Sequence, residues 1–143
     1  MQAYIIGIDL GGMSAKAALF DKEGRIVAKK SIVTNAADGF EGTAAKLAEV
    51  AKGVAQAAGA AFEDVEKIGI ASPGVVNSKT GVILKWSNYG WTDVPLGDTV
   101  AKLTGKKVCV VNDANAAAFG EAKFGSGSLY PVSYTHLRAH ETS

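Results

Sequence analysis

Three apolar segments at the start of the chain constrain the fold more than any other feature. Residues 4–10 are almost continuously apolar, which is typical of a strand covered on both faces near the centre of a sheet. Residues 14–20 and 25–34 follow as a second and a third predicted strand, joined by the turn Asp21-Lys22-Glu23-Gly24. These strands predict an antiparallel meander. Lysines at positions 29 and 30 favour an edge position for the third strand.

A long amphipathic helix is predicted next. Asp38 is the expected N-cap, with Glu41 three residues later as its capping-box partner, and Gly59 is the expected end. The apolar positions recur at spacings of three and four; they are Phe40, Ala44, Leu47, Ala51, Val54 and Ala58. The polar positions off this stripe, expected to be solvated, are Lys46, Glu49, Lys52 and Gln56.

The rest of the chain alternates strands with helices. Strands are predicted at 65–71, closed by Pro73-Gly74, and at 82–86 and 107–111. Helices are predicted at 95–104, with Pro95 near the first turn, and at 113–124. A meander followed by this alternation predicts the α/β class, a mixed sheet of five principal strands with helices on its faces.

Composition excludes several kinds of protein. The 143 residues are 48% hydrophobic and 20% charged, as expected of one globular domain with a sizeable core. A net charge of +1 provides no basic field for nucleic acid or an anionic membrane. One cysteine, Cys109, excludes an internal disulfide and fits a reducing compartment. With no membrane-length apolar run and no signal peptide, a cytoplasmic protein is expected.

The last sixteen residues do not continue the pattern. After Gly125-Ser126-Gly127 no helical or strand period is visible, so 128–143 are expected to be a non-native or disordered tail, outside a domain of residues 1–127. His136 and His140 have the spacing of two ligands on one helical turn. Two histidines without a third ligand rarely form a metal site.

Two interpretations of the glycine pair Gly11-Gly12 are open on local sequence alone. Glycines allow a tight turn and let backbone N–H groups approach phosphate oxygens. In that interpretation Asp9 holds Mg²⁺, usually through water, and Lys16 offsets the charge of a phosphoryl group. In the other, the glycines satisfy hairpin geometry and Asp9 caps the loop. The G-x-x-x-x-G-K-[ST] spacing of a Walker A motif is absent.

Other candidate residues also have two interpretations. Asp113 follows a buried strand, so it is a candidate for chemistry held rigidly at a carboxyl end of the sheet, a simple N-cap of the next helix, or both. Trp86 and Trp91 form an apolar wall for a ligand or pack a loop onto the domain. Cys109, between valines, is expected in the core.

Three separated blocks carry a family resemblance: "GIDLGGMSAKAALFD", "GIASPGVVNSKTGVILKWSNYGWTDVPL" and "VVNDANAAAFGEAKFGSG". The first resembles the D-x-G-G-T-x-x-K phosphate motif of the ROK family of sugar kinases and repressors, within the actin–hexokinase superfamily. The second resembles that family's G-x-P-G turn with its later Asn and Trp, and the third its catalytic Asn-Asp segment. Together they span residues 5–127 in family order. The resemblance implies a ribonuclease H-like fold.

The resemblance also implies roles for individual residues. Asp113 would accept the proton of a sugar hydroxyl as it attacks the γ-phosphate of ATP, and Asp9 would hold Mg²⁺. Nucleotide phosphates would lie on Gly11, Gly12, Ser14 and Lys16, and the sugar on Gly74, Asn88, Asn112 and Asp113. One departure stands out, because Met13 replaces the family's usual Thr and removes a hydroxyl near the phosphates. The side chain of Ser14 would point to the other side of the strand.

The family has two lobes, and this chain resembles the first. The second phosphate motif, the adenosine site, the Glu-x-Gly-His sugar ligands and the cysteines of a structural zinc site are absent. The chain is therefore expected to be the N-terminal lobe of an ATP-dependent hexose kinase, inactive as this fragment. Its expected partners are ATP and a small sugar. Neither nucleic acid nor a membrane is an expected partner, and homo-oligomer formation is left as an open possibility.

Three alternatives are less favoured. A sugar-responsive repressor of the same family would carry a helix-turn-helix before the first strand, which here is expected to begin at residue 3 or 4. An actin- or chaperone-like ATPase would not need the polar groups of Asn88 and Asn112-Asp113. The fragment could also be only a sugar-binding or oligomer-forming module.

Overall fold

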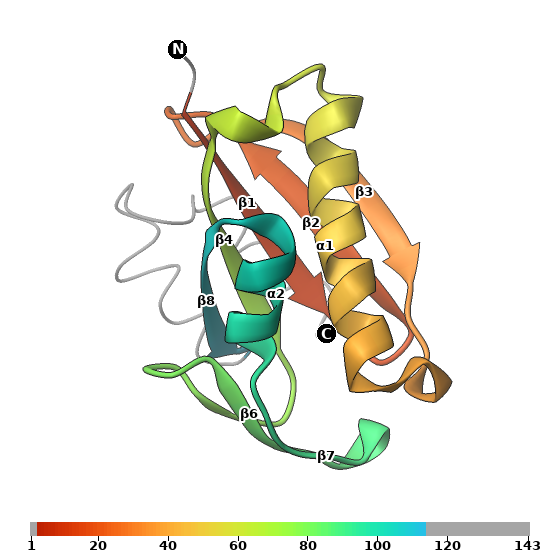
Figure 1. Cartoon of the computed structure of the whole chain (residues 1–143). Helices are drawn as coiled ribbons and strands as arrows, with labels where there is room; N and C mark the ends of the chain where they lie inside the picture. The colour runs from red at the N-terminus through yellow and green to blue at the C-terminus, as the bar shows by residue number, and fades with distance from the viewer. Residues whose placement is uncertain (1–2, 114–143) are drawn as a thin grey trace.

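A five-stranded mixed sheet forms the centre of the molecule (Figure 1). The computed structural model describes residues 3–113. The strands β1 (Tyr4–Leu10), β2 (Ser14–Phe20) and β3 (Ile26–Val33) form the predicted antiparallel meander. On the other side of β1, β4 (Val65–Ser72) and β8 (Lys107–Asn112) run parallel to it. The order β3-β2-β1-β4-β8 confirms β1 as the central strand and β3, with its lysines, as an edge.

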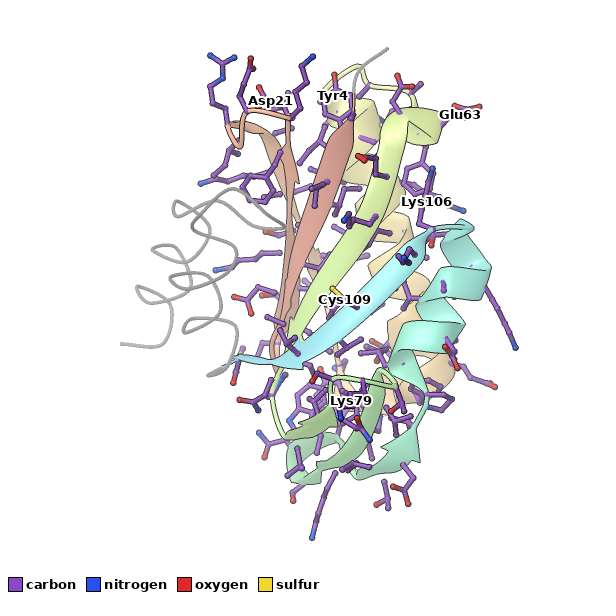
Figure 2. All side chains as sticks on the ribbon, turned by 90° about the vertical axis from the view of Figure 1, so that its left-hand side faces the viewer. Tyr4, Asp21, Glu63, Lys79, Lys106 and Cys109 are labelled. Atoms are coloured by element: carbon purple, nitrogen blue, oxygen red, sulfur yellow. The ribbon has the colours of Figure 1, made fainter. Side chains whose placement is uncertain are left out.

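The helices α1 (Gly39–Ala57) and α2 (Leu96–Thr104) lie on the same side of this sheet (Figure 2). The predicted apolar stripe of α1 is confirmed, because Ala44, Leu47, Ala51 and Val54 are all fully buried. They pack against alternate residues of the strands, such as Ile8 and Ile70, in one continuous core. The helix predicted at 113–124 lies, from residue 114 on, outside the described residues.

The start of α1 differs from the prediction. The capping box is formed one turn earlier, by Asn35 and Asp38 around a short 3₁₀ helix, η1 (Ala36–Asp38). Asn35 Oδ1 accepts the N–H of Ala37, and Asp38 Oδ2 accepts the N–H of Asn35. Asp38 also lies 2.7 Å from Lys46 Nζ, so Lys46 is half-buried rather than solvated. Asp38 has no side-chain capping bond to α1, because its carboxylate is already engaged on η1.

The end of α1 follows the prediction. Gly59 has a positive φ of 71°. Its N–H donates to the Gln56 carbonyl, and the N–H of Ala60 donates to the Ala55 carbonyl. This pair of bonds is the Schellman arrangement, in which glycine is favoured because it adopts a left-handed conformation without a Cβ penalty.

A small second sheet lies beyond the carboxyl ends of the parallel strands (Figure 1). It contains β5 (Val75–Asn77), β6 (Val82–Trp86) and β7 (Trp91–Val94). Only β6 was predicted, because β5 has three residues and β7 four, too short for a periodic pattern. The short 3₁₀ helix η3 (Ser87–Tyr89) joins β6 to β7, and another, η2 (Phe62–Asp64), precedes β4. None of the helices within residues 3–113 is long and apolar enough to cross a membrane.

The opposite end of the main sheet carries the β2–β3 turn. Figure 2 shows Tyr4 and Asp21 at this end, far from Lys79 in the turn between β5 and β6. The Asp21 carboxylate accepts the backbone N–H groups of Arg25 and Glu23, and these bonds, with the charge of Arg25, lower the pKa of Asp21. The hydrogen bonds accepted by the Asp21 side chain therefore stabilise the turn of the predicted β2–β3 hairpin.

Candidate functional site

A pocket of about 500 Å³ opens at the carboxyl ends of β1 and β8. In open α/β sheets, ligands bind at this edge. Seven of the predicted site residues line it, and they come from three separate segments of the chain: the β1–β2 corner, η3 and the end of β8. The lining residues are Asp9, Leu10, Gly11, Gly12, Met13, Ser14, Lys16, Pro73, Trp86, Asn88 and Asp113.

Strand register positions the charged side chains of this pocket. Asp9 and Lys16 are direct partners in the β1–β2 ladder, so their side chains leave the same face of the sheet. In the parallel part of the sheet, Asp9 is paired in register with Ala71 of β4, and Ala71 is paired with Val111 of β8. The next residue on each of these strands toward the amino end, such as Ile8 or Ile70, enters the helix-covered core. The charged pair therefore lies on the face opposite α1 and α2.

Asp113 approaches the same pocket from β8. It follows the last residue of that strand and is half-buried. Two strand spacings of roughly 4.8 Å separate β1 from β8, or about 10 Å between the two strands that end near Asp9 and Asp113. Ala71 contributes only a methyl group on the strand between them.

The glycine pair forms a tight corner that is open to the pocket. Gly11 N–H donates to the Ser14 carbonyl at 2.9 Å, which closes the turn between β1 and β2. A Cβ on Gly11 would lie 3.2 Å from that same carbonyl oxygen, whereas a Cβ on Gly12 would meet nothing within 4 Å. Neither glycine has a positive φ, so close approach favours glycine at position 11, and the space around Gly12 stays open. The hairpin role and an exposed backbone suited to phosphate therefore coexist.

Two residues that the sequence did not single out hold this corner. The Tyr89 hydroxyl oxygen lies 2.8 Å from the Gly12 carbonyl oxygen and 3.0 Å from Thr34 Oγ1. Thr34, which is buried, donates its hydroxyl to the Gly11 carbonyl at 3.3 Å and its N–H to the Met13 carbonyl at 3.0 Å. No local motif predicts these bonds, because 23 and 77 residues separate the partners in sequence.

Gly74 and Asn112 lie beside the pocket, each next in sequence to a lining residue. The Asn112 amide donates to the Gly74 carbonyl and joins the end of β8 to the β4–β5 turn. Gly74 has φ +85°, and a Cβ there would lie 2.3 Å from the Lys85 carbonyl oxygen. Both residues therefore have a structural role in addition to the predicted contact with sugar.

The two tryptophans have different positions. Both are 4% exposed and meet edge to face, with ring centroids 5.1 Å apart. Trp91 packs against Phe40 of α1, as expected of a residue that holds the second sheet on the domain. Trp86 stacks on Tyr89 with ring centroids 3.9 Å apart, and it also lines the pocket. It therefore packs η3 onto the domain and has the position predicted for an apolar wall of the pocket. Cys109 is half-buried in the middle of β8 (Figure 2).

The donor set in this pocket suits Mg²⁺ bound largely through water. Within residues 3–113, no three His, Cys, Asp or Glu side chains gather closely enough to enclose a metal ion. Mg²⁺ keeps much of its hydration shell and takes one or two carboxylates together with substrate phosphates. Asp9 is half-buried on the wall of an open pocket beside an exposed glycine, which fits that requirement.

Comparison with known proteins identifies the class to which this fold and pocket belong. A glucokinase from Streptomyces griseus, solved in complex with glucose and AMPPNP, superposes with a TM-score of 0.74 and 36% identity over 88% of this chain and 38% of that one. The glucokinase of Thermotoga maritima is 37% identical over 124 residues, 86% of this chain and 38% of its own length. A putative xylose repressor from Caldicellulosiruptor sp. is 33% identical over 121 residues, 85% of this chain and 30% of its own. The fold is thus that of the actin-like ATPase and hexokinase superfamily.

The family model of the ROK family matches residues 5–131. The chain belongs to the ROK family. It spans less than two fifths of the length of the glucokinases that it resembles.

Proposed function

We propose that this chain is the N-terminal lobe of an ATP-dependent hexose kinase and binds the phosphates of ATP and one side of a sugar. The observation that carries the proposal is the convergence of seven predicted residues from three chain segments on one pocket. The similarity to two glucokinases supports the same activity class. We further propose that residues 1–127 form the lobe and that 128–143 are a foreign tail.

The β1–β2 corner would bind the phosphates. Gly12 leaves its backbone open to the pocket, and Lys16 brings a positive charge next to Asp9. Backbone N–H groups and a lysine are typical partners of phosphate oxygens. A Mg²⁺ ion held by Asp9 through water would neutralise charge on the transferring phosphoryl group.

The residues from η3 and the end of β8 would bind the sugar and hold its reacting hydroxyl. Asn88 supplies a polar amide, Trp86 just before η3 an apolar surface, and Asp113 a carboxylate. As the bond from the sugar oxygen to the γ-phosphorus forms and the bond to the ADP oxygen breaks, Asp113 would take the hydroxyl proton. In a loose transition state this proton moves late, so orienting the hydroxyl is a large part of the base's contribution.

The chain by itself is proposed to bind without turnover. Phosphoryl transfer requires groups positioned on both sides of a cleft, and the residues described here provide one side. Because the chain is also similar to a putative xylose repressor, a regulatory role is the second candidate function. In that role the protein would bind sugar but would not transfer phosphate. The single cysteine is compatible with the reducing cytoplasm that we propose as its compartment.

Nuclear magnetic resonance titration of the ¹⁵N-labelled chain tests the proposal. Mg·ATP is expected to shift the amide signals of Gly11, Gly12 and Ser14, while those of Gly24 and Gly59 serve as unaffected controls. A panel of hexoses is expected to shift the Asn88 side-chain amide for at least one sugar. Shifts confined to residues outside the pocket, or none at saturating Mg·ATP, would contradict the phosphate site.

A further inference from the structure

One tyrosine hydroxyl connects three parts of the chain beside the pocket. Tyr89 belongs to η3, its hydroxyl contacts the carbonyl of Gly12 in the β1–β2 corner, and it also contacts Thr34 just beyond β3. A phenol carries a single proton, so it donates to one of these two oxygens at a time. The shorter separation, 2.8 Å against 3.0 Å, is to the Gly12 carbonyl, which can only accept, so we assign the phenol proton to Gly12.

The Tyr89 ring is held in place by its neighbours. It stacks on Trp86 with planes inclined by 14° and centroids 3.9 Å apart, and it meets Trp91 edge to face at 5.5 Å. Both tryptophans are buried. A ring fixed on two sides places its hydroxyl with little loss of conformational entropy. The hydroxyl is therefore a rigid support for the corner.

The same turn carries Asn88 into the pocket. Asn88 and Tyr89 are consecutive residues of η3, and Gly90, with φ +69°, ends this turn. Asn88 lines the pocket together with Gly12, to which Tyr89 is bonded. The Tyr89–Gly12 bond therefore joins η3, which carries Asn88, to the glycine corner.

We propose that Tyr89 is a positioning residue that holds the glycine corner in the conformation that binds nucleotide phosphates. This role rests on the proposed function. Tyr89 acts through the Gly12 carbonyl, which orients the peptide groups of the corner toward the pocket.

The test compares Tyr89→Phe with the unchanged chain. Phenylalanine keeps the ring stack, so the melting temperature is expected to stay close to that of the unchanged chain. Tyr4→Phe is the matched control, because Tyr4 lies at the opposite end of β1 (Figure 2). Two readouts are measured by nuclear magnetic resonance: amide exchange rates without ligand, and the dissociation constant for Mg·ATP.

Two amide protons report directly on the corner. The Gly11 N–H is bonded to the Ser14 carbonyl, and the Thr34 N–H to the Met13 carbonyl. In Tyr89→Phe both are expected to exchange about threefold to tenfold faster, the usual effect of losing one hydrogen bond, with a similar loss of Mg·ATP affinity. The Gly24 N–H, in the turn at the far end of β2, should not change.

Each result has a definite meaning. Unchanged exchange at Gly11 and Thr34 overturns the positioning role, whatever happens to nucleotide affinity. Faster exchange with unchanged Mg·ATP affinity also overturns it, because the conformation that Tyr89 holds would then not be the one that binds the nucleotide. If the unchanged chain does not bind Mg·ATP but the corner loosens in Tyr89→Phe, the proposed function fails while the support of the corner by Tyr89 stands.

Discussion

Asp9 and Asp113 are two carboxylates in one pocket with different surroundings. Asp9 is directly opposite Lys16 and beside the glycine corner, whereas Asp113 follows β8 on the other side of Ala71. A carboxylate beside the proposed phosphate site is suited to a hydrated metal ion, and one beside the proposed sugar site to accepting a proton. The roles proposed for Asp9 and Asp113 therefore differ because of position and not because of residue type.

Asp9→Asn is predicted to weaken Mg·ATP binding by the chain about tenfold. A charged carboxylate forms stronger hydrogen bonds to the water ligands of Mg²⁺ than the neutral amide of asparagine does. The loss should shrink as the Mg²⁺ concentration rises. Asp113→Asn is the matched variant and should leave Mg·ATP affinity within about twofold. Titration at several Mg²⁺ concentrations, beside melting curves, measures both. Equal losses of affinity in the two variants would contradict the assignment of the metal to Asp9 alone.

At the scale of elements, the β4–β5 turn joins the main sheet to the second sheet and borders the pocket. It passes through Pro73 and Gly74, and the Gly74 carbonyl accepts the amide of Asn112 from β8. Its closest approach is to the Lys85 carbonyl of β6, where only a glycine fits. The turn thus combines a positive φ with a close backbone contact.

Gly74→Ala is predicted to destabilise the chain by about 3 kcal/mol or more, the sum of left-handed strain and overpacking. Gly59→Ala is the control, because Gly59 has a similar φ of 71° but open space around a Cβ. That variant should cost about 1 kcal/mol. Urea unfolding of both variants measures the difference. Equal losses would show that the contact with β6 is not a constraint.

The long elements could be predicted because each has a strong local pattern. The continuous apolar run of β1, the lysines of β3 and the apolar stripe of α1 all lie where sequence places them. The capping box was predicted one turn late, because Asn35 and Asp38 are both plausible caps, and in the structure the Asp38 carboxylate closes the box with Asn35 and contacts Lys46. The short strands β5 and β7 depend on pairing with β6 and have too few residues for a period.

The candidate site was predictable only in part. Asp9, Gly11, Gly12 and Asp113 were found from short motifs, and the sheet order then brings their segments together. Tyr89 and Thr34 were not found, because their contacts with the glycine corner join segments that no sequence pattern connects. Their role depends on tertiary structure alone.

At the scale of the whole molecule, the last sixteen residues are predicted to be foreign to the lobe. They lie outside the described residues. Deleting 128–143 is expected to leave the melting temperature unchanged or to raise it, since a terminus that does not pack contributes no stability. Differential scanning calorimetry of the shortened chain measures this. A clear fall in melting temperature would show that these residues belong to the fold.

The central claim is that this lobe supplies the catalytic base of a sugar kinase. In the glucokinase of Thermotoga maritima, which is 37% identical over 124 residues, the matching N-terminal segment should be replaced by residues 1–127 of this chain, with the unaltered enzyme as control. The most direct measurement is the rate of glucose phosphorylation by this chimera with and without Asp113→Asn. We predict that the chimera phosphorylates glucose and that Asp113→Asn lowers kcat about a hundredfold or more, the usual contribution of a general base, with little change in sugar affinity. A folded chimera that is inactive, or one whose kcat is unchanged by Asp113→Asn, would contradict the account.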